Sequence, residues 1–167
     1  MLNGSIPTQL CQLKSLKILD LSRNKLHGSI PRCIENLEGM ILKQPVSMQS
    51  SKFIAEAPPH IWSNEFLTNE DSAPSPMGDG WSDQGLHGLN LSENQLEGEI
   101  PQLIGNMKSL ESLDISHNQL SGKIPNTMSA ITSLSFLNLS HNNFSGPFPK
   151  DNQFSTFNDP PNYAYNP

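Results

Sequence analysis

Four polar residues recur at one position of a repeated phrase, each between a serine and an asparagine. They are Arg23, Glu93, His117 and His141, and the last three have the residue types of a zinc triad. We expect them to lie on neighbouring strands of a flat parallel stack, where solvent reaches the column and nothing encloses an ion. The sequence therefore predicts no metal site and no cofactor.

A second possible site is the hydrolase-like set Asp114, Ser116 and His117. Neighbours on one strand point to opposite faces of a sheet, so these three side chains cannot converge as a triad requires. The sequence also contains no phosphate-binding glycine loop, H-E-x-x-H or C-x-x-C motif. We therefore expect no catalytic residues and a protein that is not an enzyme.

The elements that carry these residues repeat at a fixed length. Units of 24 residues begin at Leu13, Asp83, Met107 and Ile131. The pattern L-x-x-L-x-L-x-x-N-x-L inside each unit predicts a leucine-rich repeat solenoid, an α/β-type fold with a parallel strand per repeat on its concave face. The expected strands centre on residues 17–21, 87–91, 111–115 and 135–139. Asparagines in the turns should satisfy backbone groups of adjacent repeats: Asn24, Asn94, Asn118 and Asn142.

The period fails between the first complete unit and the second. We expect repeats over residues 1–41 (the first one partial), an irregular island over 42–82, three repeats over 83–154 and a C-terminal flanking segment over 155–167. Proline, serine and charge in the island argue against a compact core. Its Trp62 and Trp81 are candidate ligand anchors, with packing onto the solenoid flank as the alternative.

Side chains between the inward leucines should point outward, where a partner can reach them. These candidate binding residues are His87, Gly88, Asn90, Glu93, Glu111, Ser112, Asp114, His117, Ser135, Phe136, Asn138 and His141. Phe136 has no core to fill on that face, which favours an interface anchor. The alternative is that it packs against Phe154 and Phe157.

Two further features concern the compartment. Cys11 and Cys33 occupy nearly the same place in successive repeats, whose strands lie about 5 Å apart. A disulfide fits that spacing and would indicate an oxidising environment, whereas two buried thiols are the alternative. The N-x-S sequons at Asn3, Asn90, Asn138 and Asn143 predict glycosylation of an extracellular protein.

Charge and chain length limit the partners further. The net charge is −6 with no basic cluster, so we expect neither nucleic acid nor anionic membranes as partners. No apolar run is long enough to span a bilayer, and Met1 already lies within a repeat, without a preceding signal peptide. We therefore expect part of a longer protein or a truncated product.

The phrases DLSRNKLHGSIP, GLNLSENQLEGEIP, LESLDISHNQLSGKIP and LSFLNLSHNNFSGP resemble plant receptor-like proteins, as does the tail QFSTFNDPPNYAYNP. These are cell-surface receptors with a leucine-rich repeat ectodomain, one membrane span and no kinase domain. The resemblance covers residues 2–36 and 86–167. It implies a non-catalytic extracellular module that binds a peptide, protein or glycan ligand and recruits a receptor kinase or co-receptor in defence or developmental signalling.

The family's N-terminal cap, C-terminal cap and membrane span are missing from this sequence, so attachment to the plasma membrane would need a span outside it. The alternatives are a soluble extracellular inhibitor of cell-wall hydrolases and a truncated product without activity. The island argues against the inhibitor, because inhibitors of that kind normally lack one.

Overall fold

The computed structural model describes residues 1–13, 15–38, 85–149, 154, 157 and 162–167. The repeats, from Met1 to Ile41 and from Gln84 to Pro167, form one contact unit. Trp62, Trp81 and the rest of the expected island lie outside the described residues. The account below therefore concerns the repeat unit by itself.

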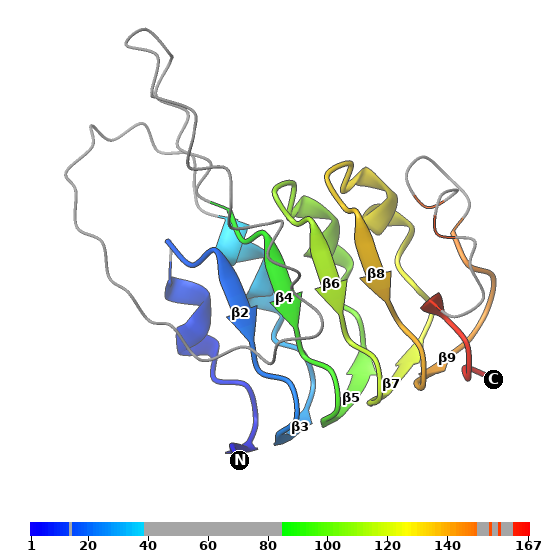
Figure 1. Cartoon of the computed structure of the whole chain (residues 1–167), viewed down its shortest axis with the longest axis horizontal. Helices are drawn as coiled ribbons and strands as arrows, with labels where there is room; N and C mark the ends of the chain where they lie inside the picture. Colours follow the sequence, from blue (N-terminus) through cyan, green and yellow to red (C-terminus); the bar gives the residue numbers. More distant parts are fainter. Residues whose placement is uncertain (14, 39–84, 150–153, 155–156, 158–161) are drawn as a thin grey trace, which may run out of the picture. The chain divides into compact units, whose positions relative to one another are not determined.

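The three repeats that begin at Leu13, Asp83 and Met107 each contribute one strand to a first sheet, one strand to a second sheet and one 3-10 helix (Figure 1). The partial repeat before them adds a strand to the second sheet and a helix, and the last repeat adds one strand to each sheet. The first sheet contains, in order, β2 (Ile18–Asp20), β4 (Gly88–Asn90), β6 (Ser112–Asp114) and β8 (Phe136–Asn138), all parallel. The second contains β1 (Asn3–Gly4), β3 (Lys25–Gly28), β5 (Gln95–Glu99), β7 (Gln119–Gly122) and β9 (Asn143–Phe144). The helices are η1 (Thr8–Gln12), η2 (Arg32–Glu38), η4 (Gln102–Asn106) and η5 (Asn126–Ala130). The predicted solenoid and its four parallel strands are confirmed.

The leucines of the repeat pattern form the core. Leu19, Leu89, Leu113 and Leu137 lie in register on the four strands of the first sheet, and each is at most 8% exposed. The isoleucine before the proline, which follows the strand of the second sheet, closes the core, as Ile100 does with 1% of its surface exposed, and Phe148 takes this place in the last repeat. Because every repeat buries the same positions, β2 and β4 pair directly although they are 70 residues apart in sequence.

An asparagine ladder fixes the distance between repeats, as predicted. Asn94 donates from Nδ2 to the carbonyls of Leu21 (2.9 Å), Leu91 (3.1 Å) and Ser92 (3.1 Å), and its Oδ1 accepts from the amide of Leu26 (3.0 Å). Asn118 and Asn142 repeat this arrangement. Buried backbone groups that would otherwise lack partners are thus satisfied by one side chain per turn.

The ladder continues beyond the fourth leucine repeat, which the sequence pattern did not indicate. Asn166 donates to the carbonyls of Leu139 (3.1 Å) and Tyr163 (2.8 Å) and accepts from the amide of Phe144 (2.9 Å). The amide of His141 donates to the carbonyl of Ala164 at 2.9 Å. Residues 162–166 therefore add part of a further turn without a single leucine.

Candidate ligand-binding face

The face of the first sheet that points away from the core, here called the outer face, holds the candidate binding residues. The parallel register and the repeat arrange its side chains in four rows that run across the strands. The first row is Lys17, His87, Glu111 and Ser135; the second is Ile18, Gly88, Ser112 and Phe136; the third is Asp20, Asn90, Asp114 and Asn138; the fourth is Arg23, Glu93, His117 and His141.

The first row is connected by polar contacts. Lys17 Nζ lies 3.4 Å from Nε2 of His87, whose Nδ1 lies 2.8 Å from Oε1 of Glu111. The hydroxyl of Ser135 donates to the backbone carbonyl of Glu111 at 3.0 Å. These contacts link the long side chains of three successive repeats.

The third row departs from the sequence-based prediction. Gly88 of the second row, which the sequence predicts to be exposed, is buried. The same prediction is wrong for Asn90 and Asp114, which are only 3% and 7% exposed. The Oδ1 atom of each accepts the amide of the serine two residues later, at 3.1 Å and 2.9 Å. Asn90 Nδ2 also lies 3.4 Å from Oδ2 of Asp20, and the half-buried Asn138 makes the same contact with Asp114. These short side chains bend back onto the strand ends and hold the turns.

The fourth row has an unusual backbone. Its four residues have φ between 51° and 56°, and Tyr165, one turn further on, has φ 58°. This left-handed conformation is uncommon for residues with a side chain, and here it directs five side chains outward above the asparagine ladder. The residue at this position is arginine, glutamate, histidine, histidine and tyrosine in successive turns.

Two kinds of contact link this row. Arg23 Nε donates to Oε1 of Glu93 at 2.9 Å. The rings of His117 and His141 are stacked with centroids 4.0 Å apart, and Tyr165 stacks on His141 at 4.2 Å. Tyr165 was not predicted as a site residue, although aligning A-Y-N with S-H-N would have found it.

The stacked geometry also bears on the metal question. Parallel imidazole rings present their faces to each other, and Glu93 is paired with Arg23, so Glu93, His117 and His141 do not converge. Within the part of the chain that the structure describes, no group of three His, Cys, Asp or Glu residues is placed to hold a metal ion.

The second row carries exposed apolar side chains at its ends. Ile18 is 52% exposed and Phe136 is 41% exposed. Phe136 thus remains at the surface, while the ring of Phe154 packs against Phe148 (5.3 Å between centroids) and Phe157 (6.0 Å). Phe136 is therefore available to a partner.

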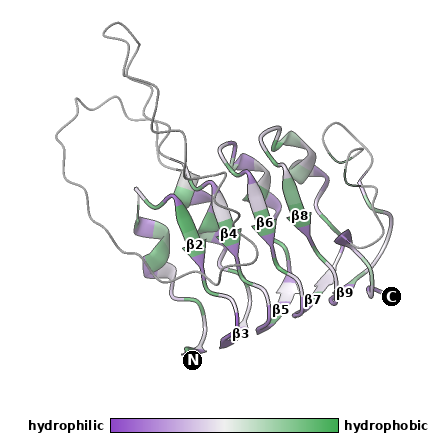
Figure 2. Ribbon diagram, viewed as in Figure 1, coloured by the Kyte–Doolittle hydropathy of each residue, from purple (hydrophilic) through white to green (hydrophobic). Residues whose placement is uncertain are grey.

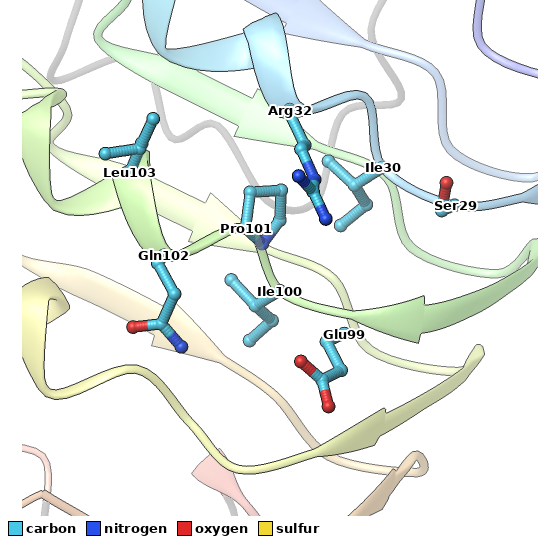
Figure 3. Close-up of a pocket in the computed structure, with 8 residues that line it drawn as sticks. All are labelled: Ser29, Ile30, Arg32, Glu99, Ile100, Pro101, Gln102 and Leu103. Atoms are coloured by element: carbon cyan, nitrogen blue, oxygen red, sulfur yellow. The ribbon is translucent and has the colours of Figure 1, made fainter.

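A pocket of about 490 Å³ lies elsewhere, where η2 and η4 meet the second sheet (Figure 3). Its lining comes from Ser29, Ile30 and Arg32 of one repeat and from residues 99–103 of the next. Arg32 and Glu99 bring opposite charges to an otherwise largely apolar surface. The pocket contains no residue of the outer face.

The compartment-related residues also have defined positions. Cys11 and Cys33 form a disulfide with their Cα atoms 5.7 Å apart. Of the sequon asparagines, Asn3 and Asn143 are exposed, whereas Asn90 is buried and bonded. Among the described residues, no helix has the length and apolar character needed to cross a bilayer.

Comparison with known proteins agrees with this architecture. Leucine rich repeat family models match residues 15–37 and 84–144, together about half of the chain. Receptor-like protein 35 of Arabidopsis thaliana is 34% identical over 108 residues, which are 65% of this chain but 9% of that protein. The chain thus spans only a small part of the curated relative's length.

Two solved structures are similar as well. The Arabidopsis thaliana BIR3–SERK2 complex matches with a TM-score of 0.64 and 28% identity, covering 98% of this chain and 62% of that one. The plant peptide hormone receptor RGFR1, in complex with RGF2, matches with a TM-score of 0.51 and 32% identity, covering 89% and 20%. By its repeats, its stacked parallel strands and these matches, the chain belongs to the leucine-rich repeat family and is similar to part of the ectodomain of plant receptor-like proteins.

Proposed function

We propose that this chain is a non-catalytic, extracellular recognition module whose outer face binds a peptide or protein ligand. The observation that carries the proposal is the second row, where Ile18 and Phe136 keep large apolar surfaces exposed on an otherwise well-ordered sheet. Exposed apolar groups rimmed by polar residues mark interaction sites. The first row on one side, with its His87–Glu111 contact, and the third row on the other, with its Asn90–Asp20 contact, provide such a rim.

Prior order of the face supports the same function. A ligand loses less free energy when the groups it meets are already held in place. The asparagine ladder fixes the strand spacing, and the first and fourth rows hold their long side chains by contacts between repeats. The likeness to the peptide hormone receptor RGFR1 supports a peptide as the ligand class.

A second ectodomain is the other partner that we propose. The likeness to the BIR3–SERK2 complex supports pairing between solenoids of this kind, and a receptor kinase or co-receptor would fill that role here. The Tyr165–His141–His117 stack, with Tyr165 76% exposed, is the aromatic surface we assign to that contact. The Cys11–Cys33 disulfide and the exposed sequons at Asn3 and Asn143 support an extracellular location.

The experiment is to select peptides from a displayed random library on the immobilised chain and to map their site by hydrogen exchange. We expect protection of β4, β6 and β8. A matched pair of charge reversals provides the control: Glu93→Lys on the outer face should weaken binding, and Glu97→Lys on the second sheet should not. Protection confined to η2, η4 and η5, or equal losses in both variants, would contradict the proposal.

A further inference from the structure

The pocket at the η2–η4 junction lies between two repeats and contains charges of both signs (Figure 3). Its volume of about 490 Å³ is in the range of pockets that hold small organic ligands. Leu103, which is 50% exposed, and the half-buried Pro101 supply apolar surface to its lining. Figure 2 shows both hydrophobic and hydrophilic residues along the 3-10 helices, so this side of the unit is not uniformly polar. The pocket therefore offers an apolar wall that a ligand can contact.

One repeat position differs in chemistry at this junction. In the next repeat the position of Leu103 holds Thr127, whose hydroxyl donates to the carbonyl of Gln102 at 2.6 Å. In the preceding repeat the same position holds Cys33, whose Sγ lies 3.9 Å from the carbonyl oxygen of Thr8. The side chain of Leu103 has no donor for such a bond. The pocket thus lies where the sequence does not allow this contact between successive helices.

Two charged side chains of the pocket have no charged partner of their own. Arg32 comes from the start of η2 and Glu99 from the end of β5. Within the described part of the chain, neither forms an ion pair or a side-chain hydrogen bond, with each other or with another residue. Figure 3 shows the Arg32 side chain extending toward Ile30 and Pro101. In the same view Glu99 lies on the other side of Ile100, so apolar residues separate the two charges.

These charges favour a ligand that carries one group of each sign. A carboxylate matches the guanidinium of Arg32, which can donate two parallel hydrogen bonds to it. An ammonium group matches the carboxylate of Glu99, which only accepts hydrogen bonds. A ligand with a single charge would gain one of these contacts and would meet a like charge at the other. A zwitterion with an apolar body gains both contacts and also covers Leu103.

We propose that the η2–η4 pocket binds a short apolar peptide with both ends free, of the size of a dipeptide. Its terminal carboxylate pairs with Arg32, its terminal ammonium pairs with Glu99, and its side chains contact Leu103 and Pro101. Both charged side chains are exposed, so each ion pair contributes modestly and the apolar contacts provide most of the affinity. The pocket shares no residue with the outer face, so this inference goes beyond the proposed function and does not depend on it.

The test titrates the dipeptide Leu-Phe into the full chain and follows the backbone amide signals by NMR. We expect the largest shifts within residues 29–32 and 99–103. Leu-Phe-amide, which lacks the carboxylate, and acetyl-Leu-Phe, which lacks the ammonium, should each bind about threefold more weakly. Gly-Gly, which keeps both charges without apolar side chains, should bind about tenfold more weakly or not measurably.

Protein variants assign each end of the dipeptide to one residue. Arg32→Gln should bind Leu-Phe about threefold more weakly and should no longer distinguish it from Leu-Phe-amide. Glu99→Gln should likewise lose the distinction between Leu-Phe and acetyl-Leu-Phe. Leu103→Ser should weaken binding about fivefold, because it removes the exposed apolar wall. Glu97→Gln, at an exposed glutamate of the same strand outside the pocket, is the matched control and should change affinity less than about twofold.

The outcomes separate this inference from the proposed function. The absence of saturable shifts at residues 29–32 and 99–103, or equal affinity for Leu-Phe and both blocked dipeptides, would overturn the inference. Shifts confined to β4, β6 and β8 would also overturn it, because the dipeptide would then occupy the outer face. None of these results bears on longer peptides at the outer face, which the library selection tests independently.

Discussion

Two junctions between successive 3-10 helices can be compared directly, because the same two repeat positions occur at each. At the η1–η2 junction these positions hold Cys11 and Cys33, which form a disulfide. At the η4–η5 junction they hold Gly105 and Thr127, 22 residues apart like the cysteines. A Cβ atom on Gly105 would lie 2.7 Å from Cβ of Thr127 and would collide with its backbone. At the η1–η2 junction a disulfide joins the two helices, whereas at the η4–η5 junction the glycine, which has no side chain, allows the two helices to approach closely.

The junction between them, η2–η4, has neither device. Its equivalent positions hold Glu35 and Leu103, two large side chains. Asn106 Nδ2 donates to Oε2 of Glu35 at 2.6 Å, and Leu103 remains 50% exposed. The pocket lined by Arg32 and Glu99 opens at this junction. Parallel strand pairing continues across all three junctions, through β1–β3 at the first and through β2–β4 and β4–β6 at the other two, while the pair of residues between the helices differs at each junction.

Removing the disulfide at the η1–η2 junction should have the largest effect on the stability of the fold. Replacing both cysteines by serine, Cys11→Ser with Cys33→Ser, should lower the free energy of unfolding by about 3 kcal/mol, because the cross-link restricts a loop of about 22 residues in the unfolded chain. Urea denaturation followed by circular dichroism measures this. A loss below 1 kcal/mol would mean that the η1–η2 junction holds without its bond.

A substitution of Gly105 at the η4–η5 junction should have the next largest effect on the free energy of unfolding. Gly105→Ala should cost about 2 kcal/mol, because the new methyl group meets backbone atoms of Thr127 that cannot rotate away. Glu35→Ala at the equivalent position of the open junction is the matched control, and we expect a change below 1 kcal/mol in the same assay. If the two substitutions lower the free energy of unfolding equally, the proposed difference between the η4–η5 and η2–η4 junctions is wrong.

The smallest effects on stability are expected at Thr127 and Leu103, the second residues of the pairs at the η4–η5 and η2–η4 junctions. Thr127→Val removes the hydroxyl that donates to the carbonyl of Gln102 at 2.6 Å, and should cost about 1 kcal/mol. Leu103→Ala should cost about 0.5 kcal/mol, because half of the side chain is already in water. Thermal unfolding of the two variants side by side provides the measurement, and a larger loss for Leu103→Ala would reverse the assignment of the open junction.

The sequence predicts the strands and the asparagine ladder well, because the spacing of the leucines shows which side chains point into the core and the asparagines repeat with the same period. It does not predict the burial of Asn90 and Asp114, since alternation gives the side of the sheet but not the bonds that fold a short side chain back onto the next turn. The leucine pattern does not predict the roles of Tyr165 and Asn166, because their turn contains no leucine. The sequence indicates the pair Cys11 and Cys33, whereas the close approach of Gly105 to Thr127 is visible only from the positions of their atoms.

The left-handed backbone of the fourth row and of Tyr165 has a consequence for which residues these positions can hold. At Arg23, Glu93, His117, His141 and Tyr165 a side chain is carried in a conformation that costs about 1–2 kcal/mol per residue relative to a right-handed one. Glycine at any of these positions would remove that cost without disturbing the ladder asparagine beside it. The backbone at these turns therefore has the same conformation in each repeat, while the type of residue at this position can differ.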